Sequence, residues 1–160
     1  MFELLPGVGV VLPHNAGVLR FGMSEERAQW VLSTIADVRG YWSCGGRGVD
    51  DGHREHWSFG ARLGALDIDV TGSEHGCRNI TFAREGGLTV DPVVWRDVDV
   101  FGYPAAEVEA ALPPPAEREE LGLYLFPGTP GLPSAPEATA QSHMARVRLT
   151  TEDRSARRMY

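Results

Sequence analysis

Residues 18–35 read VLRFGMSEERAQWVLSTI, and this segment predicts a short strand, a glycine turn and an amphipathic helix. The apolar strand over 18–21 ends at Gly22, because a strand that turns sharply into a helix needs a residue that tolerates unusual φ. Ser24 is a favourable N-cap, and the two glutamates after it suit the positive end of the helix dipole. Apolar residues then recur at helical spacing, at Ala28, Val31, Leu32 and Ile35. The segment therefore predicts a helix over 24–36 with one buried face.

A second copy of this order is found when Phe101-Gly102 is aligned on Phe21-Gly22. In this alignment apolar residues are paired with apolar residues: Val98 with Val18, Val108 with Ala28, Ala111 with Val31 and Leu112 with Leu32. Both copies predict a strand, a Phe-Gly turn and an amphipathic helix, which covers 104–112 in the second copy. The pattern favours an internal duplication. The alternative is two unrelated strand–glycine–helix turns, which are common in α+β proteins.

The other apolar segments predict an α+β fold rich in antiparallel strands. Three apolar residues alternate with polar ones, as in a half-buried strand: Leu66, Ile68 and Val70. The predicted strands cover 8–12, 62–70, 78–83, 92–101, 121–126 and 144–149, and those at 62–70 and 78–83 form a hairpin. We predict two tandem units over 1–90 and 91–150, each a short amphipathic helix packed on an antiparallel sheet. The two units can form one compact domain, followed by a flexible tail over 151–160.

The composition excludes several classes of function. The 160-residue chain has a formal net charge of −7, and all 15 of its Lys and Arg residues are arginines. A nucleic-acid-binding protein usually carries a basic stripe, which the sequence lacks. The lack of lysine excludes Schiff-base, P-loop and Ser–Lys chemistry and suits a GC-rich bacterial genome. The N-terminal residues have no basic cluster, and no apolar run approaches the ~20 residues of a membrane helix. We therefore expect a cytoplasmic protein that does not contact membranes.

The segment 18–32, with Phe-Gly-Met-Ser at 21–24 and apolar residues after it, resembles the start of a known repeat unit. This unit occurs in β-lactamase-inhibitor-protein-like domains and in the related small lipoproteins of outer-membrane assembly. The resemblance implies a strand leading into a short helix that packs on a four-stranded antiparallel sheet. In the inhibitor proteins the unit occurs twice, and the concave sheet binds a protein partner. Residues 98–112 resemble it less closely, because Tyr103-Pro104 replaces Met-Ser/Thr. The resemblance therefore implies a fold and a non-catalytic role, and the inhibitor activity itself is not carried over.

One group of residues has the side chains of a metal site: Cys44, His53, His56, His75 and Cys77. Thiolate and imidazole are good zinc ligands, and a structural zinc site needs four of them. The spacing matches no standard zinc finger, and on a strand the rings of His53 and His56 would point to opposite faces. We therefore expect neither a metal nor another cofactor. A disulfide between Cys44 and Cys77 is a second interpretation, but the expected cytoplasmic location favours free thiols.

Six other residues are the binding candidates: Asp67, Asp69, Asp97, Asp99, Trp30 and Trp42. The aspartates form two pairs at i, i+2, which share one face of a strand and suit either a divalent ion or, more simply, the wet face of an antiparallel sheet. Trp is enriched at binding hot spots, and Trp30 lies off the apolar stripe of its helix, so we expect it to be partly exposed. We predict that the four carboxylates form one polar surface, suited to a basic protein partner.

The predicted function is a non-enzymatic protein-binding module of the immunity or inhibitor type. Two alternatives are a small metal-dependent enzyme, built on the Cys and His residues between 44 and 77, and a housekeeping interaction domain. A protein partner is expected in the first and third cases, and nucleic acid in none of them.

Overall fold

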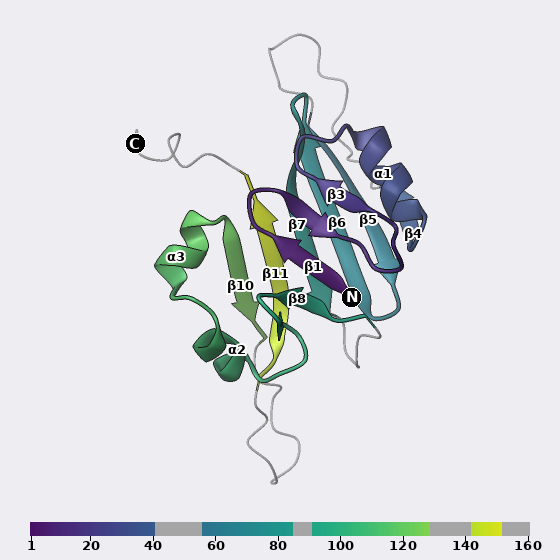
Figure 1. Ribbon diagram of the computed structural model, residues 1–160. Helices are drawn as coiled ribbons and strands as arrows, with labels where there is room; N and C mark the ends of the chain where they lie inside the picture. Colours follow the sequence, from purple (N-terminus) through teal and green to yellow (C-terminus); the bar gives the residue numbers. More distant parts are fainter. Residues whose placement is uncertain (41–55, 85–90, 129–141, 152–160) are drawn as a thin grey trace.

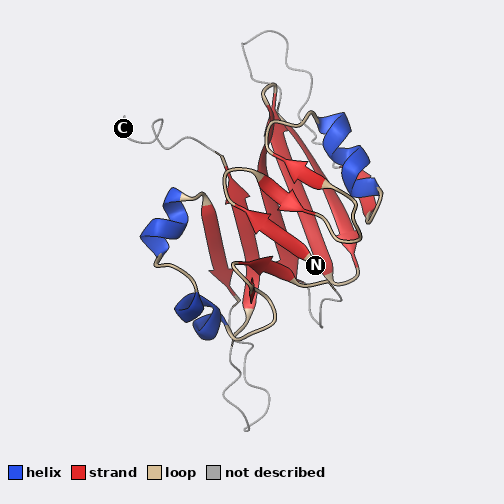
Figure 2. Ribbon diagram, viewed as in Figure 1, coloured by secondary structure: helices blue, strands red, loops and turns tan. Residues whose placement is uncertain are grey.

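The computed structural model describes residues 1–40, 56–84, 91–128 and 142–151, and in it two β-sheets lie face to face (Figure 1). The described residues form eleven strands and three helices (Figure 2). The predicted α+β class is therefore confirmed.

The smaller sheet has five strands in the order β3-β2-β1-β8-β9. Their bounds are Val18–Arg20 for β3, Gly9–Val11 for β2, Phe2–Leu5 for β1, Val93–Trp95 for β8 and Val98–Asp99 for β9. β1 pairs antiparallel with β2 and parallel with β8, so the N-terminal strand lies in the middle of this sheet.

The larger sheet has six strands in the order β10-β11-β7-β6-β5-β4, and all of its pairs are antiparallel. Their bounds are Leu123–Pro127 for β10, Met144–Thr150 for β11, Gly76–Arg84 for β7, Leu66–Ser73 for β6, Trp57–Leu63 for β5 and Asp37–Gly40 for β4. The hairpin predicted from the strands at 62–70 and 78–83 is confirmed, because β6 pairs antiparallel with β7.

The two sheets enclose one hydrophobic core. The ring of Phe2 on β1 meets the ring of Phe82 on β7 edge to face, with the ring centroids 5.2 Å apart. The inward residues of β6 are fully buried, as their alternation predicts: Leu66, Ile68 and Val70. Burial of one large apolar side chain contributes about 1.5–3 kcal/mol relative to its exposure, so this layer is the main source of stability.

The helices lie at the two flanks of the sheets (Figure 1). α1 (Glu25–Ser33) contacts β3, β4, β5 and β7, whereas α2 (Ala105–Ala111) and α3 (Pro115–Glu120) lie on the opposite flank. α1 confirms the predicted first helix, because the Ser24 hydroxyl accepts a hydrogen bond from the Arg27 amide at 3.3 Å and Leu32 is buried. None of the helices that the structure describes is long and apolar enough to cross a membrane.

A close approach of two backbone segments explains the glycine that follows β3. Gly22 has φ +81°, the conformation for which a glycine was predicted. Its amide donates to the Cys77 carbonyl at 2.9 Å, and the Cys77 amide donates to the Met23 carbonyl at 2.7 Å. A Cβ on Gly76 would lie 2.7 Å from the Gly22 Cα, closer than real Cβ atoms come. The strand–helix turn is thus held against the β6–β7 hairpin by contacts that only glycine permits.

Two predicted strands are wrong because each contains a turn. The strand predicted over 62–70 is split at Gly64, which has φ +60° and separates β5 from β6. The strand predicted over 92–101 folds back on itself, because Arg96 and Asp97 have φ +49° and +64°. Two successive residues with positive φ make the tight turn that best fits a twisted hairpin, and here they connect β8 to β9.

Three elements are additional to those predicted, β1, β4 and α3, and β5 was predicted only in its last two residues. The prolines at 113–115 follow the end of α2, and Pro115 is the first residue of α3. Proline suits the first turn of a helix, since its missing amide hydrogen needs no partner there.

The predicted units over 1–90 and 91–150 share both sheets. β1 pairs with β8 and β7 pairs with β11, so each sheet joins strands from either side of residue 90. The two segments therefore contribute to one core, as the prediction of a single compact domain allows. Most of the predicted tail, residues 152–160, lies outside the described residues.

Candidate functional site

One face of the six-stranded sheet points away from the five-stranded sheet, and we call it the open face. Paired residues of antiparallel strands project to the same side, so the register defines two rows of side chains across this face. The first row is Asp37, Arg62, Asp67, Ala83, Arg146 and Phe126. The second row is Arg39, Gly60, Asp69, Thr81, Arg148 and Tyr124. The buried apolar residues of the described elements belong to the core on the other side, and the residues of both rows other than Gly60 are half-buried or exposed.

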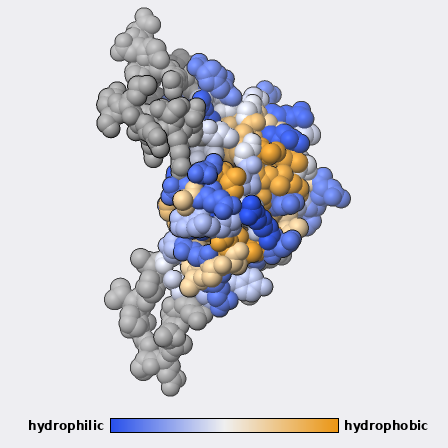
Figure 3. All heavy atoms as spheres, turned by 60° about the vertical axis from the view of Figure 1, so that its left-hand side comes forward, coloured by the Kyte–Doolittle hydropathy of each residue, from blue (hydrophilic) through white to orange (hydrophobic). Residues whose placement is uncertain are grey.

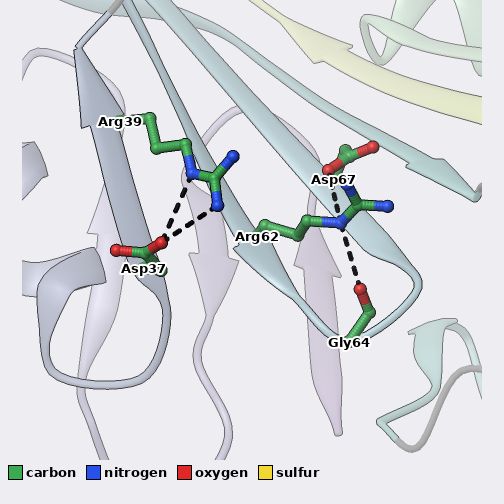
Figure 4. A network of polar contacts seen from close by, with 5 residues as sticks. All are labelled: Asp37, Arg39, Arg62, Gly64 and Asp67. Carbon is green, nitrogen blue, oxygen red and sulfur yellow. Dashed lines mark hydrogen bonds and ion pairs between the residues drawn. The ribbon is translucent and has the colours of Figure 1, made fainter.

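Carboxylates and arginines alternate across the β4, β5 and β6 part of the open face (Figure 4). Arg39 donates to Asp37 through Nε and Nη2, both at 3.3 Å, and the Arg62 Nε lies 3.5 Å from an oxygen of Asp67. Burial raises the pKa of the Asp69 carboxyl, and the neighbouring charge of Asp67 raises it further, while Arg146 opposes the rise. The aspartates of β6 thus lie on the polar side of their strand, as predicted, but arginines flank them on both sides.

At the β10 and β11 end, two arginines lie over two aromatic rings. The Arg146 guanidinium is 4.5 Å from the ring centroid of Phe126, and that of Arg148 is 5.1 Å from the ring of Tyr124. Arg148 also lies 5.6 Å from the ring of Phe126. We call these four residues the arginine–aromatic platform. None of these four residues was among the predicted binding candidates, although each pair has the i, i+2 spacing that places two side chains on one face of a strand.

The other two aspartates do not belong to this face, so the prediction of one surface with four carboxylates is wrong. Asp97 lies in the tight turn between β8 and β9. Asp99 accepts a hydrogen bond from the Phe101 amide at 3.1 Å, which fixes the turn into α2. Both residues belong to the edge of the five-stranded sheet, and that sheet packs on the opposite side of β6 from Asp67 and Asp69.

The exposure predicted for Trp30 is confirmed. Its side chain is 63% exposed on α1, and the Arg27 guanidinium lies 5.7 Å from its ring centroid. These residues, with Ser24 and Glu26, line a shallow hollow. Trp42 lies outside the described residues. Hydrophobic side chains also lie between hydrophilic ones on the flank with β10, α2 and α3 (Figure 3).

Two members of the predicted metal cluster are directed apart. The His75 side chain is 68% exposed and lies 3.3 Å from a carboxylate oxygen of Glu74, whereas Cys77 is buried in the core. His75 lies in the turn between β6 and β7 and is exposed to solvent, whereas Cys77 lies on β7 inside the core, so these two residues do not form a ligand pair. Cys44 and His53 lie outside the described residues, and within 56–84 and the other described segments no three His, Cys, Asp or Glu residues are grouped around a metal position.

Cys77 is a free, buried thiol, and its burial raises its pKa from 9.0 to about 12. A thiol reacts as its thiolate, so this shift and the shielding both slow its chemistry. In a Cys44→Ser variant we expect Cys77 of the native protein to react with a disulfide reagent at pH 8 roughly 1,000-fold more slowly than in urea, from the shift of about three pKa units. Absorbance of the released thiol measures both rates. Equal rates in the native and unfolded protein would contradict the buried position.

The chain matches no protein-family model, no curated protein and no solved structure. The resemblance of residues 18–32 to the inhibitor-type repeat therefore stays a prediction. The open face is therefore the structural basis for the function proposed below.

Proposed function

We propose that this chain is a non-enzymatic protein-binding module of the immunity or inhibitor type, and that it binds its partner through the open face. The observation that carries the proposal is a polar and aromatic sheet surface, six strands wide, on which none of the described elements packs. Arg and Tyr are enriched at the centre of protein interfaces, and both occur in the arginine–aromatic platform.

The charge pattern of the open face supports a protein partner over a nucleic acid. The acidic strand β6 lies between arginines of β5 and β11, so the sign of the charge changes along each row. Such a pattern selects a partner with the complementary pattern and disfavours others by like-charge contacts. A nucleic acid presents uniform negative charge, which Asp67 and Asp69 would repel. The partner, which the sequence predicts to be basic, is therefore expected to carry its basic groups opposite Asp67 and Asp69.

We also propose that the segments 18–32 and 98–112 derive from one repeat. Both lead from a strand through Phe-Gly into a helix, α1 in the first copy and α2 in the second. Leu32 and Leu112, which the alignment pairs, are both buried. The shorter β9 and α2 agree with a second copy that has lost residues.

The binding role is tested with the photo-crosslinking residue p-benzoylphenylalanine in place of Thr81. Thr81 lies in the second row, paired with Asp69 on one side and Arg148 on the other. In a lysate of the source cells we expect this variant to cross-link one protein, and added unmodified chain to compete for it. The matched control carries the same residue in place of Glu109, which is exposed on α2. Equal cross-linking from both positions, or none from Thr81, would remove the open face as the contact surface.

A further inference from the structure

The arginine–aromatic platform contains two guanidinium groups that have no direct carboxylate partner among the described residues, although the charge of Arg146 acts on Asp69. In the part of the chain that the structure describes, neither Arg146 nor Arg148 forms an ion pair. The Nε of Arg148 is buried and has no hydrogen-bond partner there. No acceptor of the described residues therefore satisfies this side of the Arg148 guanidinium, and a buried donor without a partner is unfavourable.

The aromatic rings hold these guanidinium groups in place. Each guanidinium lies over a ring at 4.5 to 5.1 Å from the centroid, which restricts the long side chain before any partner arrives. A guanidinium that stacks through its flat face leaves N–H groups at its edges that can still donate hydrogen bonds. Those edges match the two oxygens of a carboxylate in a bidentate pair, which is stronger and more directional than a contact with lysine.

We propose that the platform binds a segment of the partner protein that carries carboxylates at alternate positions of an extended chain. This inference rests on the proposed function and specifies the chemistry of the partner. Arg146 and Arg148 are two positions apart on β11, which corresponds to about 6.8 Å along a strand. Carboxylates at i and i+2 of an extended segment have the same separation, so both ion pairs form at once when the segment lies along β11. Basic residues of the same partner then face Asp67 and Asp69 on β6.

Nucleic acid fits this platform less well. Single-stranded nucleic acids bind through bases stacked on free aromatic faces. Here the faces of Tyr124 and Phe126 are already occupied by guanidinium groups.

The test uses a fluorescein-labelled peptide of four Asp-Thr repeats and measures its fluorescence anisotropy with the full chain at low salt. We expect it to bind about tenfold or more tightly than the corresponding Asn-Thr peptide, and the difference to shrink as salt is added. The double variant Arg146→Gln/Arg148→Gln should lose this preference. Arg146→Lys/Arg148→Lys keeps the charge without the planar N–H edges and should lose at least about fivefold in affinity. Arg27→Gln, which removes another ring-stacked guanidinium on α1, is the matched control and should bind like the original chain.

Several results would overturn the inference. These are equal binding of the two peptides, full affinity in either double variant, and tighter binding of an eight-nucleotide oligothymidylate than of the Asp-Thr peptide. Urea unfolding of each variant separates loss of binding from loss of folding. If the glutamine variant does not fold, the lysine variant, which keeps both charges, still tests the inference. If the peptide does not bind but Thr81 still cross-links a partner, only this inference fails. If Thr81 also fails to cross-link, the proposed function fails with it.

Discussion

Gly76→Ala is expected to destabilise the protein by more than about 3 kcal/mol in urea unfolding. Gly76 has φ +96°, so any side chain there is strained by about 1–3 kcal/mol. The new Cβ would also meet the backbone of Gly22, which is not a flexible neighbour that can move aside. Separation of the two segments would break the hydrogen bonds that join Gly22 and Met23 to Cys77, each contributing about 1 kcal/mol.

The matched control is Gly64→Ala in the turn between β5 and β6. Gly64 has φ +60°, but a Cβ there would meet nothing within 4 Å. Only the backbone strain remains, so we expect a loss of about 1–2 kcal/mol. Similar losses in the two variants would show that the close approach of Gly22 and Gly76 contributes nothing beyond backbone conformation.

The elements that could be predicted from the sequence are those whose own residues carry a strong period. The stripe Ala28, Val31 and Leu32 with its Ser24 cap predicts α1, and the alternation of Leu66, Ile68 and Val70 predicts β6. The turn at Arg96-Asp97 gave no such signal. Asp tolerates positive φ, but Arg rarely adopts it, and no glycine marks the position. The apolar residues on both sides therefore matched one continuous strand.

The arrangement of the sheets could not be predicted from local patterns. The parallel pairing of β1 with β8 joins residues about ninety positions apart, and β7 pairs with β11 across two helices and the strands β8, β9 and β10. Such pairings depend on which apolar faces meet in the core and not on the residues of either strand alone. This is why two tandem units were predicted where the strands of both share each sheet.

In the candidate site, too, some residues could be placed from local patterns and others only from the pairing of the strands. The place of Asp67 and Asp69 followed from the alternation of β6, because their apolar neighbours had to point inward. The arginine–aromatic platform needed the register that sets Tyr124 opposite Arg148 and Phe126 opposite Arg146. Once 121–126 and 144–149 were predicted as strands, the i, i+2 pairs of aromatic and basic residues were the available signal. The pairing of these residues across the sheet could not be predicted from the sequence.

Leu32→Ala and Leu112→Ala are both expected to lower the free energy of unfolding by about 2–5 kcal/mol, with the larger loss at Leu32. Leu32 is 0% exposed and belongs to α1, a helix that contacts strands of both sheets. Leu112 is 6% exposed and lies at the C-cap of the shorter α2, at the flank of the core. A cavity near the surface collapses or fills with water more readily than one between two sheets, so its cost is smaller.

The controls are Gln29→Ala in α1 and Glu109→Ala in α2, which remove side chains off the buried stripes. Glu109 is exposed, and Gln29 makes one hydrogen bond to Glu25 at 3.2 Å on the helix surface, so we expect changes within about 0.5 kcal/mol. Urea unfolding of the four variants compares the two helices directly. A large loss for Leu32→Ala with a change at Leu112 no larger than that of Glu109→Ala would mean that α2 contributes no buried face. The second segment would then lack the buried helix face that makes it comparable to the first, and the proposed duplication would fail. Neither leucine contributes to the open face, so the proposed binding role would still be decided by the cross-linking and peptide-binding experiments.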